Sequence, residues 1–237
     1  MKLSRRQKPL YLQIMNILKD RILHGVYPVG TNIPSEPQLE QEFQVSKITV
    51  RSAIKELTQE GYLETGSGKG TRVIRNTSSS KLSKLKRFTE VLVEEGHRIR
   101  KQLLRADIAA NPEGTEAHRL FGERALRIER LYFLNDRPYI HYTHYLTSEV
   151  ADLLASDLGA QSLYGLLEEQ DVSLAKYRDE FSVETAPPDV QAALGVPPGG
   201  LLLKRTRYSY DAEGGLVELS LGYYHTEMHR YVVHYDV

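Results

Sequence analysis

Cysteine is absent from the 237-residue sequence, which excludes disulfides, thiolate nucleophiles and metal sites with sulfur ligands. Long apolar runs are absent too, since none approaches the roughly 18 residues of a membrane span. The basic N-terminus MKLSRRQKPLY lacks the apolar stretch of a signal peptide. Hydrophobic residues make up 41% and charged residues 26% of the chain, as in an ordinary globular protein. We expect a cytoplasmic protein of one or two domains without a membrane partner.

The chain has no net charge, because its 31 basic residues equal its 31 acidic ones in number. The two signs are nevertheless unevenly distributed along the sequence. Residues 1–101 hold 19 Lys and Arg against 10 Asp and Glu, whereas residues 102–237 hold 12 against 21. A basic first part joined to an acidic second part indicates that only the first meets a polyanion. The alternative is a chance distribution of surface charge.

The stretch GSGKGT, residues 66–71, has some features of a nucleotide-binding P-loop. That motif, G-x-x-x-x-G-K-[ST] followed by a helix, needs a glycine where this chain has Leu63 and a hydroxyl where it has Gly70. The residues that follow, TRVIR, are rich in β-branched side chains and typical of a strand. We therefore reject the nucleotide-binding hypothesis, and the glycines need another explanation.

Helices are expected before this stretch. Apolar residues recur at helical spacing from Leu10 to Ile22, and Gly25 ends that helix. A capping box at Ser35 predicts the start of a second helix. Ser46 is the expected N-cap of a third. Two short strands around GSGKG then complete a winged helix-turn-helix, in which the glycines let backbone amides approach DNA phosphates.

The third helix has an apolar side and a basic side. Lys47, Arg51 and Lys55 recur every four residues, accompanied by the short polar Thr49 and Ser52. Such a pattern is usually a solvated face, but it is also what a recognition helix places in a major groove. The predicted DNA contacts are Ser46, Lys47, Thr49, Arg51, Ser52, Lys55, Gly68, Lys69, Gly70 and Thr71.

The segment PSEPQLEQEFQVSKITVRSAIKELTQEGYLETGSGKGTRV resembles the DNA-binding domain of the GntR family of bacterial transcription regulators. It matches the family pattern P-S-E-x-x-L, S-R-x-T-V-R-x-A-x-x-x-L, E-G and G-x-G-T, except that Lys47 stands where the family usually has Arg. Pro37 also replaces a frequent Arg, which removes one expected backbone contact. The resemblance implies a DNA-binding domain over residues 1–75. Because each winged domain covers one half-site, we expect a homodimer on a two-fold symmetric operator in double-stranded DNA.

Residues 76–83 begin with the polar run NTSSSK, lack periodicity and are interpreted as a linker. Beyond them we expect an amphipathic helix over KLSKLKRFTEVLVEEG, a hairpin around Asn135–Asp136, a second hairpin turning near 213–215, and helices at SLYGLLEEQ and PDVQAALG. Hairpins with helices between them predict an antiparallel α+β domain over residues 84–237.

This second part is similar to the UTRA effector domain of the HutC branch of the family, whose fold is shared with chorismate lyase. The similarity is carried by RIERLYFLNDRPY, DLGAQSLYGLLEE, AALGVPPGGLLLKRTRYSYDAEG and VELSLGYY. It implies a repressor that a small, often phosphorylated or acidic, metabolite releases from DNA. The effector contacts that it implies are Arg130, Ser162, Tyr164, Glu218 and Tyr224.

Each of these contacts has an alternative structural interpretation. Tyr164 and Tyr224 are equally explained as core aromatics. Ser162 is explained as the N-cap of a helix. Arg130 is explained as one half of an ion pair with a residue on a neighbouring strand.

Two tyrosines mark a departure from the amino-sugar-phosphate type of effector site. Tyr132 replaces a second arginine of that type and Tyr142 replaces a glutamate. We include both tyrosines among the predicted effector contacts, with Tyr145 as a further surface for ring stacking. Because a cation and an acid are lost, the effector is not inferred to be an amino-sugar phosphate.

Two other classes of protein are alternatives, an enzyme and an architectural DNA-binding protein. An enzyme of chorismate lyase-like fold would need activated groups, but no Ser/His/Asp signature is visible. His141 and His144 are three residues apart in an expected strand, so their side chains point to opposite faces, and His225 and His229 would align only on a helix. We expect no catalytic residue, metal or cofactor. An architectural DNA-binding protein would not need the acidic domain.

Overall fold

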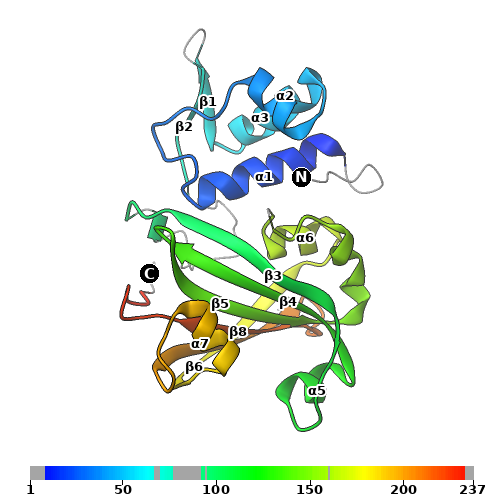
Figure 1. Ribbon diagram of the computed structural model, residues 1–237. Coiled ribbons are helices and arrows are strands. Elements are labelled where there is room, and N and C mark those ends of the chain that lie inside the picture. The colour runs from blue at the N-terminus through cyan, green and yellow to red at the C-terminus, as the bar shows by residue number, and fades with distance from the viewer. Residues whose placement is uncertain (1–8, 67–69, 77–91, 94, 160, 233–237) are drawn as a thin grey trace. The chain divides into compact units, whose positions relative to one another are not determined.

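The computed structural model describes residues 9–66, 70–76, 92–93, 95–159 and 161–232 (Figure 1). Contacts group these residues into two compact units, of which the second consists of Lys101–Gly159 and Leu163–Tyr231. No described helix is long and apolar enough to span a membrane. The predicted linker beyond residue 76, and most of the helix expected after it, lie outside the described residues.

The first unit combines helices with a two-stranded hairpin. Its elements are α1 (Leu10–Leu23), α2 (Glu36–Phe43), α3 (Lys47–Gln59), β1 (Leu63–Gly66) and β2 (Gly70–Val73). A single apolar core joins them, because Ile14 and Leu18 of α1, Leu39 of α2, and Val50 and Leu57 of α3 are all fully buried. The residues that recur at helical spacing are therefore the core residues of the unit, as the sequence predicts.

Local hydrogen bonds fix where α2 and α3 begin. The backbone N–H of Ser35 donates to Gln38 Oε1 at 2.8 Å, which is half of a capping box. Ser46 Oγ accepts from the Thr49 N–H at 3.4 Å and caps α3. Between the helices, Gln44 adopts a left-handed conformation with φ 52° and ψ 47°, so α2 ends and the chain turns into α3. The result is a helix-turn-helix.

The two short strands form the base of the predicted wing. They pair antiparallel from Leu63 opposite Val73 to Gly66 opposite Gly70. Gly70 has φ +84°, and a Cβ there would approach Asn32 Nδ2 to 2.9 Å. The backbone conformation therefore favours glycine at this position.

The second unit is built on a six-stranded sheet of order β3-β4-β5-β8-β7-β6 (Figure 1). Pairing is antiparallel from β4 through β5, β8 and β7 to β6. The strands are β3 (Ile99–Ala110), β4 (Arg124–Leu134), β5 (Arg137–Leu146), β6 (Leu174–Thr185), β7 (Leu201–Asp211) and β8 (Leu216–Tyr224).

Both predicted hairpins are present in this sheet. The β4–β5 turn is made by Asn135 and Asp136, whose φ angles are 48° and 66°. Positive φ at both central residues is the geometry that Asn and Asp tolerate best among residues other than glycine. In the β7–β8 turn, Asp211 Oδ1 accepts from the N–H groups of Glu213 at 2.9 Å and Gly215 at 2.7 Å.

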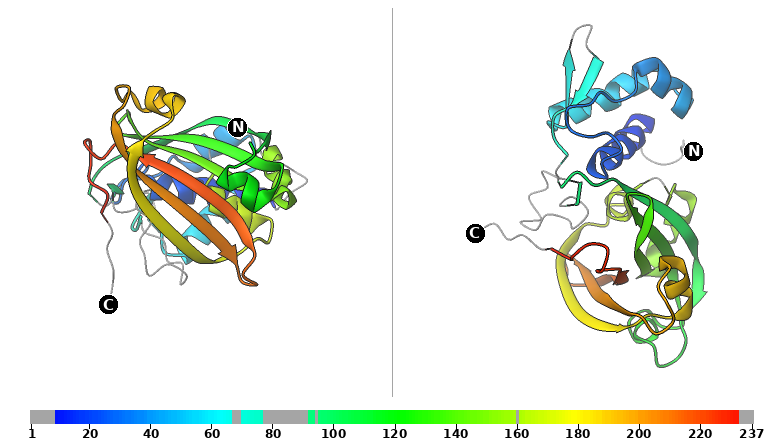
Figure 2. Two further views of the ribbon diagram at one scale, coloured as in Figure 1. Left: turned by 90° about the horizontal axis from the view of Figure 1, so that it is seen from below. Right: turned by 60° about the vertical axis from the view of Figure 1, so that its left-hand side comes forward.

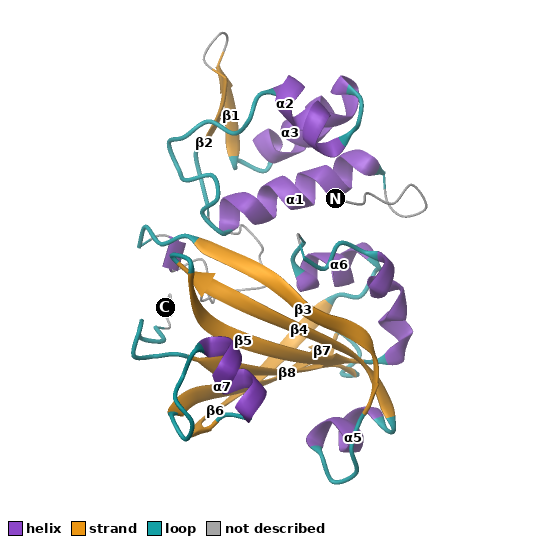
Figure 3. Ribbon diagram, in the orientation of Figure 1, coloured by secondary structure: helices purple, strands orange, loops and turns teal. Residues whose placement is uncertain are grey.

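Short helices cover both faces of the sheet (Figures 2 and 3). On one face, α7 (Pro188–Leu194) packs against Leu131 and Tyr223, and α5 (Glu116–Phe121) packs against Leu219. On the other face, Leu126 and Ile128 contribute to a cluster with α6 (Leu163–Glu169) and the 3-10 segment η1 (Ser148–Ala155). This second face also carries the polar side chains described next.

Candidate DNA-binding and effector-binding sites

The first candidate site is the outer side of α3. Lys47, Arg51 and Lys55 are exposed, and Thr49 and Ser52 are half-buried among them. The apolar stripe on the opposite side of the helix lies in the core of the unit. The first turns of α3 therefore present cations and short polar groups to solvent, which is the kind of surface that contacts phosphates and base edges.

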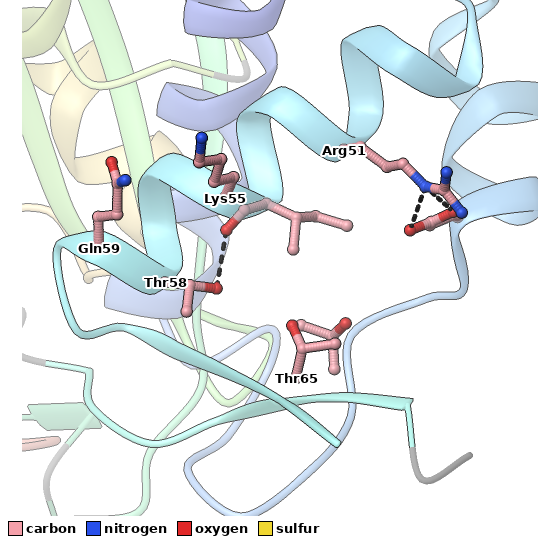
Figure 4. A pocket seen from close by; sticks show the side chains of 8 residues that line it. Arg51, Lys55, Thr58, Gln59 and Thr65 are labelled. Carbon is pink, nitrogen blue, oxygen red and sulfur yellow. Dashed lines mark hydrogen bonds and ion pairs between the residues drawn. The ribbon is translucent and has the colours of Figure 1, made fainter. Parts of the chain in front are cut away.

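Arg51 is held by the start of α2. Its Nε lies 2.9 Å and 3.1 Å from the two carboxylate oxygens of Glu36 (Figure 4). Lys47 Nζ lies 3.9 Å from the same carboxylate. The Arg51 side chain is still 60% exposed, so this is a surface ion pair of small net energy, which a phosphate or a base edge can replace. The sequence of α3 alone gave no sign of this acid.

A pocket of about 380 Å³ lies beside Arg51. Figure 4 shows Lys55, Thr58 and Gln59 extending from α3, with Thr65 of β1 below them. The lining residues are Glu36, Arg51, Ile54, Lys55, Thr58, Gln59, Thr65 and Thr71. Recognition helix and wing strands thus share one hollowed surface.

The predicted wing contacts are described only in part. Gly70 is exposed at the start of β2, and the half-buried Thr71 lies opposite Thr65. Gly68 and Lys69, at the predicted tip, lie outside the described residues.

The second candidate site is formed by cross-strand register. Arg130, Tyr142, Gly222 and Arg205 stand directly opposite one another on β4, β5, β8 and β7. Rows on the same side of the sheet place His144 and Arg207 opposite Ser220, and Ser209 opposite Glu218. We call the following set the polar face: Arg130, Tyr132, Tyr142, His144, Arg205, Arg207, Ser209, Glu218 and Tyr224.

Glu218 is a fully buried carboxylate on the polar face. His144 Nδ1 lies 2.7 Å from Oε1, and the Ser209 hydroxyl donates to Oε2 at 2.6 Å. Burial acts to raise the pKa of the Glu218 carboxyl, but the hydrogen bonds from His144 and Ser209, with the positive charge of Arg207, outweigh it and hold the pKa below its usual value. Glu218 is therefore ionised at neutral pH.

Burial also lowers the pKa of the His144 imidazole, although Glu218 acts to raise it. The ring is therefore neutral at pH 7. Because Nδ1 donates to Glu218, Nε2 is left as an acceptor. It is buried, and no described residue donates to it.

A tyrosine pair joins β5 to β8. The hydroxyls of Tyr142 and Tyr224 lie 2.5 Å apart, and Arg205 Nη2 donates to the Tyr142 hydroxyl at 3.1 Å. The Arg205 guanidinium carbon lies 5.6 Å and 5.7 Å from the centres of the two rings. Both tyrosines thus line the polar face and also position a cation there.

Arg130 is the largest fully buried side chain of the described residues, with 1% of its surface exposed. Its Nε and Nη2 are buried, and no described residue accepts a hydrogen bond from either. The interpretation of Arg130 as half of an ion pair within the sheet is therefore wrong for the described part of the chain. A buried guanidinium with unpaired donors is costly unless an anion reaches it.

The remaining predicted contacts differ in their placement. Tyr132 lies on the polar face, with its ring 5.3 Å from that of Tyr142 and edge-on to it. Tyr164 projects from α6 and contacts Tyr177 with a ring separation of 6.2 Å. Ser162 is half-buried and directly precedes α6. Tyr145, suggested as a stacking surface, is on the other side of the sheet, packed with the α5 cluster. That suggestion was wrong, because adjacent strand residues point to opposite faces.

Four members of the polar face were not among the predicted effector contacts: His144, Arg205, Arg207 and Ser209. Arg207 makes a bidentate pair with Asp179 of β6, with both nitrogen–oxygen distances 2.7 Å. The alternation in LLLKRTRYSY was a usable signal, since residues 205 and 207 must share a face of any strand. Their convergence with Arg130 depends on strand order, which no local pattern contains.

Comparison with known proteins identifies both units. The model of the UTRA domain matches residues 94–230, and the model of the gntR family of bacterial regulatory proteins matches residues 10–73. The chain belongs to the GntR family. The expected family resemblance is thereby confirmed for both parts of the sequence.

Individual relatives agree with this assignment. The transcriptional repressor NagR of Bacillus subtilis is 28% identical over 205 residues, 84% of each chain. The histidine utilization repressor of Pseudomonas aeruginosa is 29% identical over 67% of this chain and 65% of its own length. The B. subtilis regulator YisV is 51% identical, but over only 30% of this chain and 15% of its own length.

A solved structure shows the same fold. The possible transcriptional regulator YydK of B. subtilis superposes with a TM-score of 0.53 at 18% identity, covering 95% of this chain and 99% of YydK. Because family and relatives are transcription regulators, the interpretation as an enzyme is rejected. The GntR protein described here combines a DNA-binding domain with a domain for a small-molecule effector.

Proposed function

We propose that this GntR protein is a cytoplasmic repressor that binds a two-fold symmetric operator as a homodimer and is released by a small acidic metabolite, such as a sugar phosphate. The observation that carries the proposal is Arg130. It is 1% exposed, and its Nε and Nη2 are buried without a described acceptor. An anionic effector supplies the missing acceptors, because guanidinium binds carboxylate and phosphate through paired hydrogen bonds.

The DNA contacts proposed are those of α3 and the wing. Lys47, Arg51 and Lys55 are exposed on the recognition helix, and Thr71 lines the pocket that the helix shares with the wing strands. Cations on this surface supply the affinity for phosphates, while Arg51 is suited to a bidentate contact with guanine. Lys69, which lies outside the described residues, is proposed from the sequence as a further phosphate contact.

The proposed dimer surface is the edge strand β6. It ends the described sheet and is exposed along almost its whole length, with Val183 65% and Tyr177 39% exposed. An exposed edge presents unpaired backbone donors and acceptors, which a second strand can satisfy. Two chains paired at this strand carry two DNA-binding domains, as a two-fold symmetric operator requires.

Release from DNA follows from bivalency. Two linked domains bind far more tightly than one, but only while their spacing matches that of the half-sites. An effector that favours an arrangement of other spacing shifts the population away from the DNA-competent form, and DNA in turn lowers the affinity for the effector.

The proposal is tested in two steps. Operator sequences are first selected from random duplexes with the full-length protein, and the recovered consensus is examined for two-fold symmetry. Sugars, phosphorylated sugars and small organic acids are then screened for a rise in the melting temperature, and each hit is added to the protein–operator complex. We expect a symmetric consensus and an acidic hit that dissociates the complex. An asymmetric consensus, or stabilising ligands that never alter operator affinity, would contradict the proposal.

A further inference from the structure

Arg205 is a second buried cation on the polar face. It is 7% exposed, and its Nε is buried with no described acceptor. Its other nitrogens donate to phenols, Nη1 to Tyr231 at 3.0 Å and Nη2 to Tyr142 at 3.1 Å. Neutral hydroxyls satisfy hydrogen bonds but leave the charge uncompensated.

The carboxylates near Arg205 are occupied elsewhere. Asp179 forms its bidentate pair with Arg207, and Glu218 accepts from His144 and Ser209. Among the described residues neither Arg130 nor Arg205 has a carboxylate partner. Two buried guanidinium groups therefore face the same side of the sheet with no described carboxylate in direct contact and with buried donors unused, a costly arrangement unless something else completes it.

The register places the two cations at opposite ends of one row. Three strand spacings separate Arg130 from Arg205, which is roughly 14 Å between Cα atoms. Between them lie Tyr142 and Gly222, and glycine adds no side chain to the row. A molecule with a single anionic group contacts one of the two guanidinium groups and leaves the other without an anion, whereas a molecule with an anionic group at each end supplies one to both.

His144 requires a hydrogen-bond donor from the ligand, whereas the two arginines require acceptors. Its neutral ring leaves Nε2 as a buried acceptor, and no described residue donates to it. A hydroxyl or N–H of the ligand satisfies it. The site therefore favours a ligand with an anionic group at each end and a hydrogen-bond donor between them.

We propose that the effector is a hydroxylated molecule with two anionic groups, one bound by Arg130 and the other by Arg205. Sugar-acid phosphates and hydroxylated dicarboxylates belong to this class. The inference rests on the proposed effector site and adds its chemistry. The Tyr142 hydroxyl accepts a hydrogen bond from Arg205 and holds its guanidinium in place. The tyrosine that stands where the amino-sugar-phosphate type of site has a glutamate therefore positions a cation.

Sets of related compounds that differ in their anionic groups test this class of effector. Phosphogluconate is compared with glucose phosphate, gluconate and sorbitol, and malate is compared with lactate, by the rise in melting temperature at equal ionic strength. We expect the member with two anionic groups, phosphogluconate or malate, to stabilise the protein in at least one set, and removal of either anionic group to weaken its binding by roughly ten- to a hundredfold. A best ligand with one anionic group or none overturns the proposal, and so does the absence of any shift with both phosphogluconate and malate.

Arg205→Met tests the residue itself, with the exposed Arg137→Met as matched control. Since no described carboxylate contacts Arg205, Arg205→Met should not lower the melting temperature, but it should abolish the preference for the ligand with two anionic groups over its counterpart with one. A structural role predicts the reverse: a lower melting temperature and an unchanged preference. Arg205→Lys, which keeps the charge, should retain part of the preference.

Operator binding separates failure of this inference from failure of the proposed function. If wild-type protein binds its operator and is released by a ligand with one anionic group, or Arg205→Met is released like wild type, only the assignment of two anionic groups is wrong. If no small molecule alters operator binding, the regulator itself is wrongly assigned.

Discussion

Glu36 and Arg51 tie the two helices of the DNA-binding motif together at their outer surface. The carboxylate of Glu36, the first residue of α2, accepts from Arg51 Nε at 2.9 Å and 3.1 Å. The contact orients a guanidinium on the recognition helix before DNA arrives, and its terminal nitrogens remain available to a new partner. A flexible side chain of this length otherwise loses considerable entropy when it is fixed.

Arg51→Ala should therefore weaken operator binding by about 1–3 kcal/mol, the range for a base contact, and relax specificity at one base pair of each half-site. Fluorescence anisotropy with the selected operator and with single-base variants measures both effects. Arg137→Ala, which removes an exposed arginine of the effector domain, is the control and should bind like wild type. Equal affinity of Arg51→Ala and the control would remove Arg51 from the DNA interface.

The stability of the protein should fall in mild acid because of His144 and Glu218. The pKa of each group is lowered in the folded chain, so the unfolded state binds more protons and stability rises with pH. For His144 the loss begins as the pH falls through about 6.5, the usual imidazole value. For Glu218 it begins lower, near the usual carboxyl value, and is complete below the folded pKa.

Thermal melts between pH 5 and 8 test this expectation. His144→Gln should flatten the dependence between about pH 7 and 5.5, whereas His118→Gln, a half-buried histidine of α5, serves as the control. A wild-type melting temperature that rises on acidification would show that the sign is wrong.

Gly222 leaves room for the Tyr142 ring. A Cβ at this position would lie 2.6 Å from Tyr142 Cε1 and 3.1 Å from Tyr224 Cε2. Gly222→Ala should therefore destabilise the effector domain by about 1–3 kcal/mol through overpacking and weaken the effector response, because the displaced Tyr142 no longer positions Arg205. Urea unfolding measures the first effect. Gly159→Ala, where the nearest atom lies at 3.5 Å, should be tolerated.

The oligomeric state tests the edge-strand interface. We expect light scattering to report a dimer in the absence of DNA. Val183→Glu should shift the equilibrium toward monomer, because equivalent carboxylates approach each other across a two-fold pair of edge strands. Ser182→Glu adds the same charge on the opposite face of β6 and should have the smaller effect. A monomeric wild type, or a Val183→Glu dimer of unchanged affinity, would refute the interface.

Elements set by short-range chemistry were predictable from the sequence. The N-caps at Ser35 and Ser46 fix the starts of α2 and α3, and the Asn135–Asp136 pair fixes a hairpin, because each depends on residues within four positions. By contrast β6, whose sequence is LAKYRDEFSVET, was not foreseen. This edge strand is exposed on both faces, and Asp179 interrupts the alternation of Tyr177, Phe181 and Val183 with polar residues, so the pattern of a half-buried strand is incomplete.

The residues of a candidate site could be predicted from the sequence where they lie on one helix or strand. The basic side of α3 follows from its four-residue repeat, but the Glu36 carboxylate beside it comes from another helix. In the effector domain the family resemblance supplied Arg130 and Glu218. Arg205 joins them only through the order β4-β5-β8-β7, a long-range arrangement that residue spacing does not encode.

The most direct test of the account is the effector response of Arg130→Ala. Anisotropy of a labelled operator is titrated with the stabilising metabolite in the presence of wild type, Arg130→Ala and Arg137→Ala. The account predicts equal operator affinity for all three proteins without effector, release of wild type and Arg137→Ala at the same concentration, and little or no release of Arg130→Ala. Release of Arg130→Ala at the wild-type concentration would contradict it, since the buried guanidinium would then have no part in binding the effector.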